Sequence, residues 1–224
     1  QWQVSWEFIT VALPKDLVTI LWVVGLMNVV NWLDGIDGLA GGIGVISFLV
    51  LCILAMTPFV SQMHIAYLSS ILAGAYLGFL PMNWYPSKVF LGTYGSMFLG
   101  YSLAIISIIS GGKIATAALV MAFPILDACA VIIQRIWNQQ SIFQADKRHF
   151  HHKLLRLGLS QRQAVGVMYT VSSIFGVSAL IFQTQGKAIV FVLGAILMTV
   201  ASLGITWVVT RATSDKAGKH DIIV

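Results

Sequence analysis

The sequence predicts an all-α, polytopic integral membrane protein, a bundle of about seven transmembrane helices forming one domain over residues 1–224. Composition is the first reason: 58% of the residues are hydrophobic and only 9% are charged, and the mean hydropathy is +0.88. The second reason is that the apolar residues gather in seven runs, near the ~17–25 residues that a helix needs to cross a bilayer. Soluble domains carry far more charge than this, so that class is excluded.

The first three apolar runs are delimited by clear breaks in the sequence. Residues 1–16 are mixed in polarity and are predicted to form a loop. Gly35 and Gly38 favour a tight turn after the first run, because glycine accepts backbone conformations that other residues avoid. Pro58 closes the second run, since proline cannot continue a helix. The runs cover about 17–32, 38–56 and 64–81.

The remaining four runs are separated by two longer polar connections and two short ones. A loop at 83–94, broken by Pro86, precedes the fourth run, and Gly111 opens a turn after it. Pro124 predicts a kink in the fifth run, because a proline inside a helix removes a backbone hydrogen bond. The connection at 134–162 is long and polar. The runs cover about 95–110, 114–133, 163–183 and 188–210.

The basic residues predict the orientation of the bundle. When the connections are assigned to alternate sides, ten Lys and Arg residues fall on one side and three on the other. Because Lys and Arg are enriched in cytoplasmic loops, the turn at 33–37 and the loops at 83–94 and 134–162 are predicted to be cytoplasmic. The net charge of +5 then suits anionic lipid head groups or phosphorylated substrates. Nothing indicates nucleic acid as a partner.

Four polar side chains recur at every third residue where the first run ends: Asn28, Asn31, Asp34 and Asp37. Residues three apart share a face of a helix, and polar groups within membrane segments usually face an interior site. An aspartate at a helix end can also be a solvated cap. Two carboxylates with nearby amide oxygens suit Mg²⁺, or the hydroxyls and ring nitrogens of a polar ligand.

A second cluster lies in the long cytoplasmic loop, where Arg148, His149, His151 and His152 are close in sequence. One interpretation is a zinc site, because imidazole is a zinc ligand, although no cysteine is near. Another is a basic surface facing anionic lipid. We favour a third interpretation, an anion-binding site in which cations and imidazoles hold phosphate, because the carboxylate turn lies on the same side of the membrane.

The third segment is the loop at 83–96, which contains Asn83, Trp84, Phe90 and Gly92. A loop rich in aromatic residues and glycine that enters a helix can hold a flat base and present backbone N–H groups to phosphate. Tryptophan and tyrosine at a membrane boundary are also ordinary interfacial anchors. The loop alone therefore leaves both interpretations open.

Together, the three segments in this order resemble the polyprenyl-phosphate N-acetylhexosamine-1-phosphate transferase family, the family of the WecA, TagO and MraY enzymes. The resemblance covers nearly the whole chain, and the histidine segment is most similar to the WecA/TagO branch. The matching motifs are Asn28-x-x-Asn31-x-x-Asp34-Gly-x-Asp37-Gly-Leu, Asp146-Lys-Arg-His149-Phe-His151-His152-x-Leu-Leu, Phe90-Leu91-Gly92 and Gly95-Ser96-Met97.

The resemblance implies a reaction on the cytoplasmic face of the bacterial inner (plasma) membrane. A polyprenyl (undecaprenyl) phosphate attacks the UDP-N-acetylhexosamine, receives sugar 1-phosphate and releases UMP, with Mg²⁺ as cofactor and a homodimer as a possible assembly. The histidine motif implies UDP-GlcNAc, with wall teichoic acid, O-antigen of lipopolysaccharide or another exported glycan downstream. Carried over, Asn31 approaches the metal, Asp34 and Asp37 hold the nucleotide-sugar, Asn28 belongs to the substrate site, Asn83 and Phe90 bind uracil, and His149, His151, His152 and Arg148 contact phosphate or sugar.

Two departures from the family pattern limit this expectation. The Asp-Asp motif of an earlier family helix has no match, so we expect the chain to be the C-terminal part of a longer protein. Thr93 stands where the family has an aspartate that binds metal, and a hydroxyl cannot replace that charge. We therefore expect the 224-residue chain alone to be inactive or nearly so.

Two other hypotheses remain at this point. The first is a non-catalytic relative that binds nucleotide-sugar or lipid phosphate, which Thr93 favours. The second is an unrelated transporter whose cytoplasmic histidines bind metal. A transporter predicts ionisable groups at mid-membrane depth, where Asp127 is the one candidate.

Overall fold

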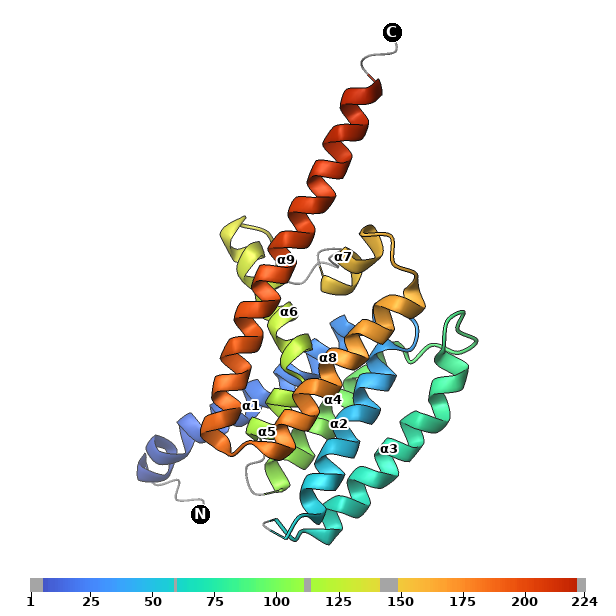
Figure 1. The fold of residues 1–224 in the computed structure, drawn as a ribbon. Coiled ribbons are helices and arrows are strands. Elements are labelled where there is room, and N and C mark those ends of the chain that lie inside the picture. Colours follow the sequence, from blue (N-terminus) through green and yellow to red (C-terminus); the bar gives the residue numbers. More distant parts are fainter. Residues whose placement is uncertain (1–5, 59, 111–113, 142–148, 221–224) are drawn as a thin grey trace.

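The computed structural model describes residues 6–58, 60–110, 114–141 and 149–220, and all regular secondary structure in these ranges is helical (Figure 1). The fold class predicted from composition and apolar runs is therefore confirmed. The helices are α1 (Trp6–Leu33), α2 (Leu39–Met56), α3 (Met63–Asn83), α4 (Gly92–Ile109), α5 (Ile114–Val120), α6 (Ala122–Trp137), α7 (Phe150–Arg156), α8 (Gln161–Ile181) and α9 (Thr184–His220).

Six of the described helices are long and apolar enough to span a membrane, and α5 with α6 makes a seventh span if the bent pair crosses as one. The two halves of that pair meet at an angle of 77°. The break falls at Met121, between the two helices and three residues before Pro124. Pro124 has no N–H, and its ring clashes with the carbonyl four residues earlier, so the helix bends before it. The kink predicted in the fifth run is confirmed.

Three predicted boundaries are wrong, and in each case the structure has more helix than the sequence predicted. Residues 1–16 are not a loop, because α1 already begins at Trp6. The connection predicted at 134–162 is shorter, because α6 continues to Trp137 and α7 forms within it. The last helix also continues beyond residue 210 to His220. Apolar runs mark the part of a helix that crosses lipid, whereas charged residues such as Lys and Arg are also good helix formers and extend it.

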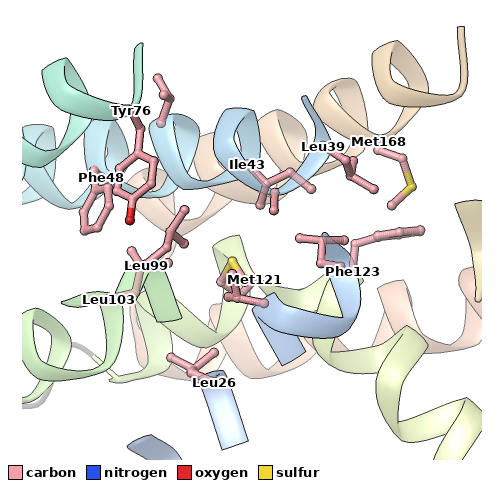
Figure 2. Close-up of a cluster of buried hydrophobic side chains, with 14 of the residues drawn as sticks. Leu26, Leu39, Ile43, Phe48, Tyr76, Leu99, Leu103, Met121, Phe123 and Met168 are labelled. Atoms are coloured by element: carbon pink, nitrogen blue, oxygen red, sulfur yellow. The ribbon is translucent and has the colours of Figure 1, made fainter. Parts of the chain in front are cut away.

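Helix α2 is the centre of the bundle and packs against α3 and α8. Its Ile43 and Phe48 meet Leu99 and Leu103 from α4 in the apolar core, which also contains Met121 (Figure 2). On its other side, α4 packs closely against α1. A Cβ at residue 100 would lie 2.6 Å from a backbone oxygen of α1, so only glycine allows this approach.

The alternation of the spans brings three polar segments to one end of the bundle. The α1–α2 and α3–α4 connections and the helix α7 lie at the upper end in Figure 1, and the C-terminal ends of α2 and α4 and the α8–α9 connection lie at the lower end. The upper end therefore contains the turn after α1, the loop after α3 and the short helix α7.

Candidate active site

The turn between α1 and α2, residues 34–38, carries two carboxylates. Gly38 has φ of +80°, a conformation that favours glycine, and it lets the chain reverse directly into α2. The pKa of Asp34 is raised to about 6, chiefly by burial; a backbone hydrogen bond from Gly92 opposes the rise, and the negative charge of Asp37 adds to it. The two carboxylates are thus close enough to repel each other.

Loop 83–92 is fastened to this turn by side chain–backbone hydrogen bonds. The Asn83 Oδ1 atom accepts a bond of 3.0 Å from Gly38 N–H, and its Nδ2 donates one of 3.0 Å to the Val89 carbonyl. Asp37 Oδ2 accepts a bond of 3.1 Å from Ser87 N–H. Because Asn83 is only 2% exposed, both ends of its amide are used inside the protein. We call residues 34–38 and 83–92 together the turn region.

Asn31 lies one turn before Asp34 and joins α1 to the start of α4. Its Nδ2 donates a hydrogen bond of 2.9 Å to Ser96 Oγ, which in turn donates to the Gly92 carbonyl at 2.9 Å. Among the described residues its amide oxygen has no partner, so this oxygen is available to a ligand. Thr93 lies beside Gly92 in the first turn of α4, and its side chain is exposed.

The histidines come from the start of α7, and Asp127 of α6 holds them. Its Oδ2 lies 2.8 Å from His149 Nδ1, and its Oδ1 accepts a bond of 2.9 Å from Phe150 N–H. The rings of His149 and His151 are parallel with centroids 5.8 Å apart, and His152 is 4.3 Å from His151. We call His149–His152 together with Asp127 the histidine region.

His151 joins the two regions. It is 1% exposed, and neither ring nitrogen has a hydrogen-bond partner within the described ranges. Its pKa is lowered to about 3, chiefly by burial and also by the nearby His152 and His149. Its Nε2 lies 2.7 Å from the position that a Cβ at residue 35 would occupy. The Gly35 of the carboxylate turn is therefore required for the imidazole to lie there.

Two of the residues predicted for the site, Asn28 and Phe90, are not held by the hydrogen bonds described above. Asn28 donates its amide N–H to the Val24 carbonyl of its own helix at 2.7 Å. Phe90 is 74% exposed, although it lies in the loop of the turn region. Arg148 lies outside the described residues. The predicted site residues that do lie in the turn region, the histidine region or the adjoining end of α1 are Asn31, Asp34, Asp37, Asn83, Phe90, His149, His151 and His152.

Other residues at this end were not predicted from the sequence as parts of the site. The Tyr169 hydroxyl of α8 donates to the Gly38 carbonyl, and its ring packs on Gly42. Arg162 donates two bonds to the Tyr85 carbonyl, at 3.1 and 2.8 Å. These contacts join residues far apart in the sequence, so no local motif predicts them. Asp127 did have one, a carboxylate in an apolar run, but the sequence did not reveal its partner.

The donor atoms of the turn region fit Mg²⁺ better than zinc. The described residues contain no group of three or more His, Cys, Asp or Glu arranged around a common ion, so they do not form the zinc site considered for the histidines. Asp34, Asp37 and the Asn31 amide offer hard oxygen ligands. Mg²⁺ commonly takes one or two carboxylates and completes its shell with water and substrate phosphate, so these three residues are the candidates to hold it.

Comparison with known proteins shows which family the chain resembles. Residues 3–111 match the family model of glycosyl transferase family 4. The chain is 36% identical over 172 residues to a probable undecaprenyl-phosphate N-acetylglucosaminyl 1-phosphate transferase of Bacillus subtilis, an alignment that covers 74% of this chain and 48% of that protein.

Two further relatives have similar names. A decaprenyl-phosphate N-acetylglucosaminephosphotransferase of Mycobacterium leprae is 37% identical over 60% of this chain and 38% of its own length. An undecaprenyl-phosphate alpha-N-acetylglucosaminyl 1-phosphate transferase of Haemophilus influenzae is 34% identical over 50% of this chain and 35% of its own length. The chain thus spans about half, or less, of the length of these curated relatives.

Proposed function

Because the chain belongs to glycosyl transferase family 4, we propose that the protein transfers N-acetylglucosamine 1-phosphate from UDP-GlcNAc to undecaprenyl phosphate. The product is a lipid-linked pyrophosphate that begins a cell-envelope glycan, and UMP is released. We place the reaction on the cytoplasmic face of the bacterial inner membrane, because the bias of Lys and Arg predicts that face for the loops at this end of the bundle.

The convergence of the two regions at one end of the bundle carries the proposal. The carboxylates of Asp34 and Asp37 adjoin the histidine region through the contact between Gly35 and His151. Transfer between two phosphorylated substrates needs oxygen ligands for a cation and hydrogen-bond donors for phosphate in one place. This end of the protein supplies both kinds of group.

Each group has a proposed task. Asn31, Asp34 and Asp37 hold Mg²⁺, which neutralises pyrophosphate charge when it is bound. The backbone of the loop in the turn region, fixed by Asn83, borders the nucleotide, and Phe90 is free to stack on uracil because its ring is exposed. The imidazoles of His149 and His152 contact phosphate or sugar. The lipid phosphate oxygen forms the new bond to the sugar-bearing phosphorus as the bond to UMP breaks.

The test is magnesium-dependent exchange of labelled UMP into UDP-GlcNAc, in membranes that contain the full-length gene product and added polyprenyl phosphate. A Thr93→Asp variant is assayed beside it. We expect exchange by the native protein and more by the variant, because residue 93 adjoins Gly92, which hydrogen-bonds Asp34. The absence of exchange by both proteins, with membrane insertion confirmed, would overturn the proposal.

A second candidate function is a non-catalytic protein that binds nucleotide-sugar or lipid phosphate. The exposed Thr93 hydroxyl favours it, because it supplies no charge at the position where an aspartate would complete the carboxylate set. This candidate predicts saturable binding of UDP-GlcNAc to the native protein without release of UMP, and exchange only in the Thr93→Asp variant.

A further inference from the structure

We propose that Asp127 is a positioning residue of the transfer reaction, which fixes the proton of His149 on Nδ1 and leaves Nε2 as a hydrogen-bond acceptor for a substrate O–H group. The inference rests on the proposed function for the identity of the substrate. It concerns a residue that neither the sequence motifs nor the comparisons place in the site.

The contact is close and buried. Asp127 Oδ2 and His149 Nδ1 are 2.8 Å apart, and the two residues are 7% and 9% exposed. A carboxylate is acceptor-only when ionised, so the hydrogen in this bond must come from Nδ1. A neutral imidazole carries one N–H, and its second nitrogen is then an acceptor. The geometry therefore selects one of the two tautomers.

Position in the fold argues for a role beyond packing. Asp127 lies in α6, within the bent pair of apolar helices, where a buried charge is costly unless it is paired. His149 lies 22 residues along the chain, at the start of the helix that presents the other histidines. Burial lowers the pKa of Lys153, and the nearby charge of Asp127 only partly opposes this; the Lys153 ammonium donates to Ser202 instead. His149 is thus the paired side chain.

Asp127 also accepts the Phe150 N–H at the start of α7, so a purely structural capping role must be separated from the electrostatic one. Asparagine caps helices about as well as aspartate. In Asp127→Asn the amide oxygen can keep the bond from Phe150, but the amide N–H₂ then faces Nδ1 of His149. The proton must move to Nε2, so this variant keeps the cap and reverses the tautomer.

The direct measurement is ¹⁵N NMR of histidine-labelled full-length protein in detergent, recorded at increasing pH until the signals stop changing. The His149 signal is assigned by its loss in His149→Gln. We expect the Nδ1–H form in the native protein and in Asp127→Glu, and the Nε2–H form in Asp127→Asn. An Nε2–H signal in the native protein would overturn the inference, whether or not the protein shows transferase activity.

The kinetic measurement uses the UMP exchange assay with the same variants and with Asp16→Asn, an exposed carboxylate, as the matched control. We expect Asp127→Asn to lower kcat by about 10²-fold or more, as loss of a positioned acid–base group does, with little change in KM for UDP-GlcNAc and an unchanged thermal midpoint. Asp127→Glu should recover part of the rate. Full kcat in Asp127→Asn would contradict the inference while leaving the transferase function intact.

Discussion

The two regions of the candidate site are held in place in different ways. Several hydrogen bonds fasten the turn region: Asn83 bonds Gly38 and Val89, Asp37 accepts from Ser87, Asp34 accepts from Gly92, and Tyr169 and Arg162 donate to Gly38 and Tyr85. In the histidine region, one carboxylate holds the start of α7, and His151 rests on Gly35 with no hydrogen bond of its own among the described residues.

The turn region is held by several contacts that can replace one another, whereas the histidine region depends on a few single contacts. A typical internal hydrogen bond contributes about 1 kcal/mol, so the turn region can lose one of its several bonds and keep its shape. Among the contacts described above, the histidine region depends on one carboxylate, that of Asp127, and on the missing Cβ of Gly35. Changes that remove a chemical group should therefore be severe in either region, whereas changes of shape should be severe only in the histidine region.

The largest expected effect comes from a change of charge in the turn region. In Asp37→Asn the side-chain oxygen can still accept the Ser87 N–H, so the loop should remain fixed while a metal-binding charge is lost. We expect UMP exchange to fall by about 10²–10³-fold, the scale of removing one electrostatic group from a reaction site. Asp16→Asn, at an exposed position of α1, is the matched control and should keep full exchange. Undiminished exchange in Asp37→Asn would remove this carboxylate from the mechanism.

A change of shape at the junction of the two regions comes next. In Gly35→Ala the new methyl group would lie 2.7 Å from His151 Nε2 and must displace the ring. Misplacement of a reacting group by about 1 Å can cost about 10²-fold in rate, and we expect exchange to fall on that scale. Gly78→Ala is the control, because no atom lies within 4 Å of its Cβ position. Equal activity of the two variants would show that His151 does not depend on this contact.

Removal of the bridging amide tests the redundancy of the turn region. Asn83→Ala leaves the buried Gly38 N–H without its partner, at a cost of roughly 1–3 kcal/mol, whereas the Val89 carbonyl belongs to an exposed residue and can turn to water. We expect a lower thermal midpoint in detergent and a loss of exchange of about tenfold, which corresponds to 1.4 kcal/mol. Asn83→Asp keeps the acceptor for Gly38 and should lie between. A large rise in KM for UDP-GlcNAc at an unchanged midpoint would instead indicate that Asn83 contacts uracil.

The smallest effect is a dependence on pH. Burial raises the pKa of Asp34 to about 6, so the carboxylate loses its charge as pH falls through that value. At limiting Mg²⁺ we expect exchange to decline below about pH 6 and to recover above it. Because a bound cation favours the ionised form, more Mg²⁺ should move this decline to lower pH. A pH profile that does not shift between two Mg²⁺ concentrations would show that Asp34 does not bind the ion.

The sequence predicted most of the spans because each one is a continuous apolar run of membrane length. The bend before Pro124 was also predictable, since it follows from the missing N–H and the ring of one residue. The extension of α1 back to Trp6 and the formation of α7 were not, because polar sequence is compatible with helix or loop.

The site was only partly accessible from the sequence for a related reason. The spacing of Asn31, Asp34 and Asp37 is local, so it could be read directly along the chain. The pairing of Asp127 with His149 depends on where α7 returns to α6, and the contact of His151 with Gly35 joins residues far apart in the sequence. No periodicity encodes such contacts, and Asp127 therefore looked like an isolated charge in a membrane span.

The central claim is that the turn region and the histidine region act on one substrate. The most direct test is Mg²⁺-dependent exchange of labelled UMP by the full-length protein, with Asp37→Asn and His152→Gln measured side by side at equal membrane insertion. We predict that the native protein exchanges UMP and that both variants lose at least about 10²-fold. Full exchange by His152→Gln alongside an inactive Asp37→Asn would show that the two regions do not share a substrate and would contradict the account.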